Sequence, residues 1–124
     1  MDLYRDLILD HYKHPRNFGH LEKPDVVMEE GNVTCGDRIV IELHVTCLKS
    51  HVTIKDVRFS GEGCAISQAS ASMLTEKVKG LNKAAVRKMN LADIEEMLGT
   101  TLTPSRVKCA TLPLEVLHKA IATI

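Results

Sequence analysis

The chain has 124 residues, 44% of them hydrophobic and 26% charged, which is enough for one globular domain with its own core, spanning 1–124. Its 16 basic and 16 acidic residues give a net charge of zero, which argues against nucleic acid or an anionic membrane as partner. We see no secretory signal and no apolar stretch near the roughly 20 residues of a membrane span. We therefore expect a cytoplasmic protein, working as a monomer or weak homo-oligomer.

The first half of the chain predicts one helix followed by three strands. Apolar residues at helical spacing predict an amphipathic helix over residues 2–14, and a weak strand follows over 25–28. Alternate apolar residues over 39–47 predict a strand with one buried face. Two alternating registers over 52–59 predict another strand with a bulge near 55–56. Short links between sequential strands predict an antiparallel meander.

The second half predicts helices. A run over 64–80 has apolar residues at helical intervals, and residues 82–98 predict one or two short helices. Pro113 lacks an N–H group, so we expect a break near 110–111 and a last helix over 112–121. Strands first and helices after predict an α+β fold, a three-stranded antiparallel sheet with helices packed over one face.

Four residues near the ends of predicted elements are candidate metal ligands: Cys35, Asp37, Cys64 and Cys109. Cys64 precedes a predicted helix, whose unpaired N–H groups favour a thiolate. Cys109 lies between basic residues, which also favour ionisation. Thiolates select zinc, copper(I) or iron–sulfur clusters, and the carboxylate of Asp37 can supply a fourth ligand. The spacing alone leaves an equal alternative, in which each cysteine is a buried, inert apolar residue. We assign Cys47 to the core, because it is in phase with the apolar face of its strand.

Four motifs occur in order along the chain: His11–Gly19, Asn32–Asp37, Gly61–Ser67 and Arg106–Leu112. Together they resemble the U-type iron–sulfur scaffold family, which includes IscU, SufU and the N-terminal part of NifU. The resemblance implies a SufE/NifU-like fold and a cysteine desulfurase as sulfur donor. It further implies a transient [2Fe-2S] cluster on Cys35, Cys64 and Cys109, with Asp37 sharing the site, and acceptor or carrier proteins that receive the cluster.

Two departures from the family pattern leave the mechanism open. Val33 replaces the usual proline of the Asn-Pro-x-Cys-Gly-Asp turn, and Lys108 stands where the IscU branch has histidine. Lysine there resembles the SufU branch, yet SufU proteins usually carry an insertion between the second and third cysteines, and the 45-residue interval here has no room for it.

The sequence therefore allows two related functions. In the first, the protein is a scaffold and carrier rather than an enzyme. In the second, it is a zinc-dependent sulfur acceptor with sulfurtransferase activity: zinc is held by the same four residues, and Cys109 leaves the metal to take the persulfide sulfur. A structural zinc module and a binding protein with inert thiols are the remaining alternatives.

Overall fold

The computed structural model describes residues 3–32 and 36–124. Three strands form one antiparallel sheet in the order β1-β2-β3, with bounds β1 (Val26–Asn32), β2 (Asp37–Leu48) and β3 (His51–Glu62). The predicted meander is confirmed. The predicted bulge is confirmed as well, because Ile54 pairs with Val45 and Asp56 with His44, which leaves Lys55 as the extra residue of β3.

Strand β1 is longer than predicted. It continues through Gly31 and Asn32, which pair with Arg38 and Asp37 of β2. Its charged and exposed residues weakened the strand signal, but an edge strand tolerates them because only one of its sides is paired within the sheet. Strand β3 likewise extends beyond residue 59, where the predicted strand ended, through Gly61 to Glu62.

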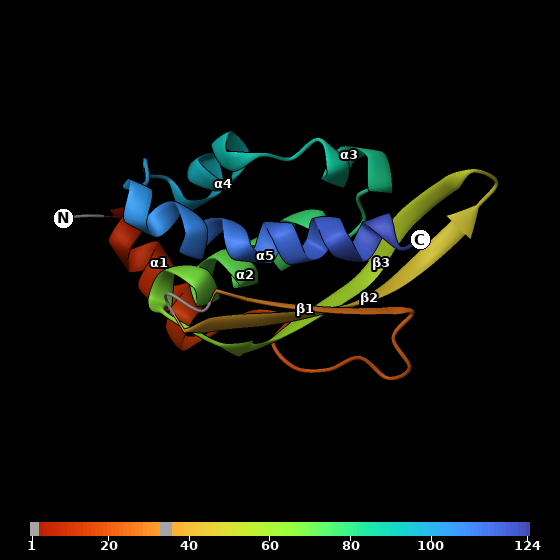
Figure 1. Ribbon diagram of the computed structural model, residues 1–124, viewed down its shortest axis with the longest axis horizontal. Helices are drawn as coiled ribbons and strands as arrows, with labels where there is room; N and C mark the ends of the chain where they lie inside the picture. The colour runs from red at the N-terminus through yellow and green to blue at the C-terminus, as the bar shows by residue number, and fades with distance from the viewer. Residues whose placement is uncertain (1–2, 33–35) are drawn as a thin grey trace.

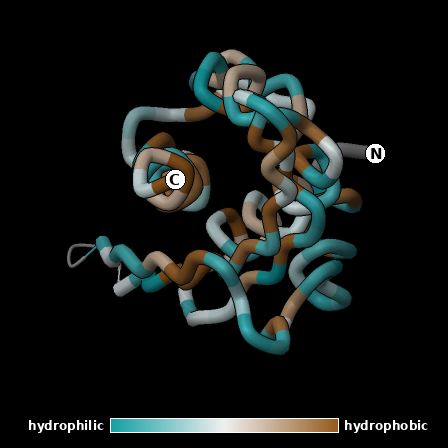
Figure 2. The backbone as a smooth tube through the Cα atoms, turned by 90° about the vertical axis from the view of Figure 1, so that its right-hand side faces the viewer, coloured by the Kyte–Doolittle hydropathy of each residue, from teal (hydrophilic) through white to brown (hydrophobic). Residues whose placement is uncertain are grey.

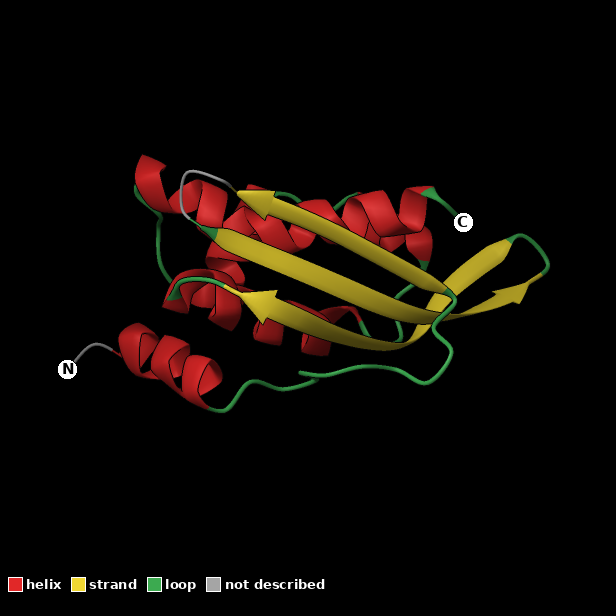
Figure 3. Cartoon of the chain, turned by 60° about the horizontal axis from the view of Figure 1, so that its bottom comes forward, coloured by secondary structure: helices red, strands yellow, loops and turns green. Residues whose placement is uncertain are grey.

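The described residues also form five helices: α1 (Leu3–Lys13), α2 (Ala65–Val78), α3 (Lys83–Arg87), α4 (Leu91–Leu98) and α5 (Pro104–Ala122). The helices α2 and α5 lie over one face of the sheet (Figure 1), and the opposite face turns toward the viewer in Figure 3. From the end that carries the C-terminus, Figure 2 shows α5 end-on beside the strands, with hydrophobic stretches on both. The predicted α+β fold with helices over one face is confirmed.

The core lies between the sheet and helices α2 and α5. Ile39, Ile41 and Leu43 of β2 are buried at alternate positions, as are Val57 and Phe59 of β3. Alternation places these side chains on the helical side of the sheet. The small residues of α2 let neighbouring helices approach closely, and most of this helix is buried.

Helix α5 runs without a break, so the break predicted near residues 110–111 is wrong. Pro113 lies inside the helix and is buried. A proline there removes one intrahelical hydrogen bond. Packing against α2, β1 and β2 holds the helix in place, and the buried hydroxyl of Ser70 donates to the Ala110 carbonyl at 2.6 Å. These tertiary contacts outweigh the local cost of the proline.

The assignment of Cys47 to the core is also wrong, because this residue is exposed. It lies near the tip of the β2–β3 hairpin, which extends beyond the helices in Figure 1. The apolar alternation of β2 continues past the region that the helices cover, so the last residues of the strand have nothing to pack against.

None of the helices in the described parts of the chain combines the length and apolar character that a bilayer crossing requires.

Candidate metal centre

Asp37 begins β2, and its side chain is buried despite its charge, with 2% of the residue exposed. The backbone N–H of Cys64 donates to its Oδ1 atom at 2.9 Å. The antiparallel pairing explains this contact, because Arg38 lies opposite Glu62 and the chain therefore reaches Cys64 beside the start of β2. One carboxylate oxygen is thus held by the backbone, and Oδ2 lies 4.0 Å from the Cys64 sulfur.

Two glycines make this close approach possible. Gly61 has a φ of +123°, and a Cβ atom there would lie 2.0 Å from the Arg38 carbonyl oxygen. A Cβ atom on Gly63 would lie 2.4 Å from Asp37 Oδ1 and 2.6 Å from Ser67 Oγ. The absence of side chains at both positions therefore lets the segment before α2 pass directly against the carboxylate.

Cys64 caps the N-terminus of α2, as its place in the sequence predicted. Its sulfur accepts the backbone N–H of Ser67 at 3.4 Å, and the Ser67 hydroxyl donates to the Cys64 carbonyl at 3.0 Å. The Ser67 Oγ atom lies 3.7 Å from the sulfur. These bonds fix the sulfur at the helix N-terminus, where the helix dipole stabilises negative charge, while the residue stays exposed to solvent.

Cys109 lies on the second turn of α5, and only 7% of it is exposed. Three possible ligand atoms lie within 4.8 Å of one another: the sulfurs of Cys109 and Cys64 and a carboxylate oxygen of Asp37. Ligand atoms of a tetrahedral zinc site are separated by about 3.6 to 3.8 Å, so shifts of about 1 Å close this group on a metal. Two soft donors and one hard donor suit zinc or iron.

The structure thus brings together Asp37, Cys64 and Cys109, which lie far apart in the sequence. Cys35, the fourth predicted ligand, lies outside the described residues. The sequence-based prediction missed Gly63 and Ser67, which position the carboxylate and the Cys64 sulfur. Both belong to the motif that carries Cys64. The sequence therefore contained them, but their roles depend on contacts with Asp37 and Cys64 that only the structure shows.

His11 of α1 is buried, with 6% exposed. Its Nδ1 atom lies 2.7 Å from the Ser72 hydroxyl of α2, which also accepts the backbone N–H of Arg16 at 2.8 Å. The Ser72 hydroxyl therefore ties α2 both to the His11 side chain of α1 and to the backbone that follows this helix. Burial is the main cause that lowers the pKa of His11 below its ordinary value.

The model of the NifU-like N terminal domain family matches residues 3–124 of this chain. The zinc-dependent sulfurtransferase SufU of Bacillus subtilis (strain 168) is 39% identical, over 97% of this chain and 90% of its own length. The iron–sulfur cluster assembly scaffold protein IscU of Aquifex aeolicus (strain VF5) is 41% identical, over 95% of this chain and 73% of its own.

These two relatives align differently. The SufU alignment spans 137 positions, whereas 97% of this chain is about 120 residues, so about 17 positions have no counterpart here. The IscU alignment spans 118 positions, which equals about 95% of this chain. The chain therefore lacks about 17 positions of the SufU alignment, whereas it aligns with the IscU protein nearly without gaps.

Solved structures share the fold. One, of a hypothetical protein, superimposes with a TM-score of 0.80 at 32% identity and covers 97% of both chains. Another is an iron–sulfur cluster assembly scaffold protein for the SUF system (FiSufU) from Fervidobacterium islandicum AW-1. It superimposes with a TM-score of 0.76 at 30% identity and covers 94% of both chains.

Proposed function

Because this chain belongs to the family of NifU-like N-terminal domains, we propose that it is an iron–sulfur cluster assembly scaffold. It accepts persulfide sulfur from a cysteine desulfurase, assembles a transient [2Fe-2S] cluster, and passes the cluster to acceptor or carrier proteins. The cluster is cargo, so the protein acts as a carrier. The reaction belongs in the reducing cytoplasm, where cysteine thiols stay available.

One observation carries the proposal: the donor atoms of Asp37, Cys64 and Cys109 lie within 4.8 Å of one another. We assign these three residues and Cys35 as the ligands of the cargo. Cys35 is two residues before Asp37 in the sequence, which is close enough for the two to share a site. Cys109 is the proposed sulfur acceptor, and its burial protects a persulfide from bulk solvent once it has formed.

The carboxylate of Asp37 gives the site its proposed transience. Stable clusters are held by four thiolates, and a carboxylate is a poorer ligand for this soft cargo. Because the backbone N–H of Cys64 already holds Oδ1, only Oδ2 faces the neighbouring sulfur. The carboxylate therefore binds through one oxygen and remains in place after release, ready for the next cluster.

Anaerobic reconstitution tests the proposal. The protein is incubated with a cysteine desulfurase, cysteine and ferrous iron, and the cluster is followed by visible absorption and Mössbauer spectra. We expect a [2Fe-2S] spectrum in the wild type and its loss in Cys35→Ser, Cys64→Ser and Cys109→Ser. Cys47→Ser is the matched control, since this exposed residue lies on the hairpin and should leave the cluster unchanged. A cluster of equal yield in Cys64→Ser or Cys109→Ser would contradict the assignment.

A second function is favoured by the lysine before Cys109 and by the 39% identity to a zinc-dependent SufU. In this function the same four residues hold zinc, which would keep the thiolates ionised and positioned. Cys109 then leaves the metal and takes the sulfur of the desulfurase persulfide. Asp37 can be the exchangeable ligand here as well.

Metal analysis and mass spectrometry separate the two functions. Tight zinc, a persulfide on Cys109 and no cluster after reconstitution would favour the sulfur acceptor. A cluster that replaces zinc under the same conditions would favour the scaffold. The alignment with the Aquifex scaffold protein, which runs nearly without gaps over 95% of this chain, leads us to put the scaffold first.

A further inference from the structure

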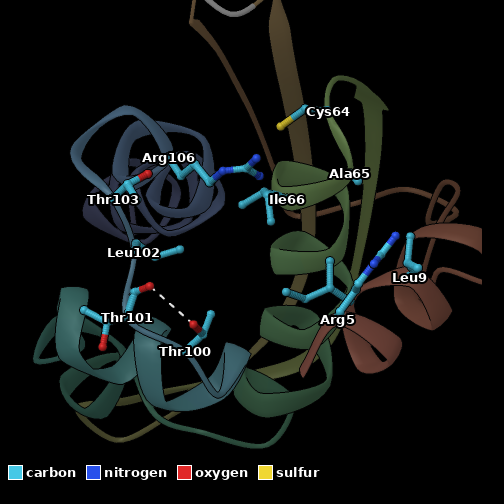
Figure 4. A pocket seen from close by; sticks show the side chains of 11 residues that line it. Arg5, Leu9, Cys64, Ala65, Ile66, Thr100, Thr101, Leu102, Thr103 and Arg106 are labelled. Atoms are coloured by element: carbon cyan, nitrogen blue, oxygen red, sulfur yellow. Dashed lines mark hydrogen bonds between the residues drawn. The ribbon is translucent and has the colours of Figure 1, made fainter. Parts of the chain in front are cut away.

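A groove of about 410 Å³ opens beside Cys64, between α1, α2 and the segment that leads into α5 (Figure 4). Its size falls within the roughly 300 to 1,000 Å³ of small-molecule sites. Apolar side chains from three parts of the chain line it, namely Ile8, Ile66 and Leu102. The groove therefore offers an aliphatic surface next to an exposed thiol.

The charge of the groove is positive. Arg106 lines it, and Figure 4 shows this side chain extended from α5 toward α2, below Cys64. Among the described residues that line the groove none is acidic. No carboxylate within residues 5–32 and 36–124 pairs with Arg106 either. A guanidinium without a counterion among the described side chains, in a groove whose described lining has no acid, favours an anionic ligand.

Polar groups along the groove also favour an anionic ligand. Thr100, Thr101 and Thr103 line it, and both α2 and α5 begin at its wall. Thr103 is the N-cap residue of α5, but its side chain makes no capping hydrogen bond. The partial positive charge of the two helix N-termini adds to that of Arg106.

We propose that the groove binds a low-molecular-weight thiol that carries a carboxylate. The carboxylate pairs with Arg106, the short aliphatic chain lies on Ile66 and Leu102, and the sulfur lies next to that of Cys64. This inference goes beyond the scaffold function, because binding requires only the groove and no cluster.

The persulfide that the proposed function places on Cys109 can pass its outer sulfur to the Cys64 thiolate, because the two sulfurs lie within 4.8 Å of each other and the Cys109 thiolate is the leaving group. The bound thiol then exchanges sulfur with the persulfide on Cys64 without any oxidant. The ligand thiolate attacks the outer sulfur, the S–S bond of the Cys64 persulfide breaks, and the ligand leaves as its own persulfide. The proton of the ligand thiol ends on the Cys64 sulfur. Atoms and electrons balance, because one S–S bond forms for each that breaks.

Two small disulfides that differ in charge test the proposal. Dithiodipropionate is anionic and hydroxyethyl disulfide is neutral, and each forms a mixed disulfide with an accessible thiol. The rates at Cys64 and Cys47 are measured by peptide mass spectrometry on chelator-treated protein. We expect the rate of the anionic probe at Cys64 to saturate with its concentration. The ratio of the anionic to the neutral rate should be about five-fold higher at Cys64 than at Cys47. Cys47 serves as an exposed internal reference in the same chain.

Arg106→Gln should remove the preference at Cys64 and leave Cys47 unchanged. Arg87→Gln is the matched control, because α3 lies at the other end of the molecule (Figure 1) and this residue is outside the groove. Equal preferences at the two cysteines, or a preference that survives Arg106→Gln, would overturn the proposal.

A binding measurement that does not depend on thiol chemistry completes the test. The protein is titrated in its zinc-loaded form with methylthiopropionate, and amide shifts are followed by NMR. We expect saturable shifts around Ile66 and Thr101, which Arg106→Gln abolishes and the uncharged amide of the ligand fails to produce. Shifts of equal size with the uncharged amide would show that the carboxylate has no role.

Discussion

The two oxygens of the buried Asp37 carboxylate have different surroundings. Oδ1 accepts the Cys64 N–H, and Oδ2 lies 4.0 Å from the Cys64 sulfur. The contact also ties the start of β2 to the start of α2. A single carboxylate therefore links ligand geometry to the fold around it.

Replacing this carboxylate by a fourth thiolate should strengthen the hold on the cluster. We predict that Asp37→Cys releases its cluster several-fold more slowly to an iron chelator than the wild type does, since thiolate is the better ligand for iron–sulfur cargo. The measurement is the decay of visible absorption after anaerobic addition of chelator. Equal or faster release would show that Asp37 does not bind the cluster.

Gly63 tests the packing around the carboxylate. We predict that Gly63→Ala lowers the free energy of unfolding by about 1 to 3 kcal/mol, because the new methyl group meets Asp37 and Ser67. It should also weaken zinc binding, measured by competition with a chromophoric chelator.

Gly80→Ala is the matched control for Gly63→Ala. Gly80 has a φ of +90°, so the change costs stability through backbone strain, but nothing lies within 4 Å of the new Cβ atom. Its zinc affinity should stay at the wild-type value. A Gly63→Ala protein with wild-type zinc affinity would contradict the proposed role of the tight approach.

The sequence carried the identities of the candidate ligands but not their distances. Cys64 could be placed at a helix N-terminus from the glycines before it and the apolar period after it. That Cys109 meets it depends on how α5 crosses α2, which is a tertiary property without a local signal. The exposure of Cys47 was missed for a similar reason, because strand alternation does not reveal where the covering helices end.

At the scale of elements, the pair α2 and α5 holds the site together, since α5 carries Cys109 and α2 begins at Cys64. The buried Ser70 hydroxyl donates to the Ala110 carbonyl across this pair at 2.6 Å. The bond involves the residue next to Cys109, so it fixes the position of Cys109 along the axis of α2.

We predict that Ser70→Ala lowers the free energy of unfolding by about 0.5 to 1.5 kcal/mol, because it removes a buried hydrogen bond between α2 and α5. Urea unfolding measures the change. Ser50→Ala, at the exposed hairpin turn, is the control and should stay within about 0.5 kcal/mol of the wild type. A Ser70→Ala protein as stable as the control would remove this bond from the account.

Helix α1 is tied to α2 by His11, and this contact should respond to pH. Burial lowers the pKa of His11 below 6.5, the nearby Arg16 charge adds to this, and Glu76 and Asp10 act in the opposite direction. The unfolded chain therefore binds the proton at higher pH than the folded chain does. The stability that neutral His11 contributes is fully present above about pH 6.5 and is lost as the pH falls from there through the lower pKa of the folded state.

The free energy of unfolding at about pH 7.5 and about pH 5.5 tests this expectation. We predict a smaller difference between the two values in His11→Gln than in the wild type. His51→Gln, which changes an exposed residue of the hairpin, should keep the wild-type difference. Identical differences in all three proteins would show that His11 does not contribute.

Helix and strand positions followed from periodicity, with two exceptions that are physical in origin. Pro113 indicated a break, because the local cost of a proline inside a helix is real. The helix continues through Pro113 because α5 packs on α2 and the sheet along its length. This packing energy cannot be predicted from the local sequence pattern. The charged residues of β1 hid its length in the same way.

At the scale of the whole molecule, the sheet and its helices bring distant segments to one end. Asp37 comes from the start of β2, Cys64 from the start of α2, and Cys109 from the second turn of α5. The β2–β3 hairpin with Cys47 extends toward the other end (Figure 1). The α+β fold could be predicted from strands followed by helices, whereas a single domain over 1–124 stays a prediction.

Zinc absorption fine structure tests the central claim, a common metal for Asp37, Cys64 and Cys109, most directly. For the zinc-loaded protein we predict three sulfur neighbours at about 2.3 Å, from Cys35, Cys64 and Cys109, and one oxygen at about 2.0 to 2.2 Å. Cys64→Ser and Cys109→Ser should each lose one sulfur neighbour, and Cys47→Ser should lose none. An unchanged sulfur count in Cys64→Ser or Cys109→Ser would contradict the account.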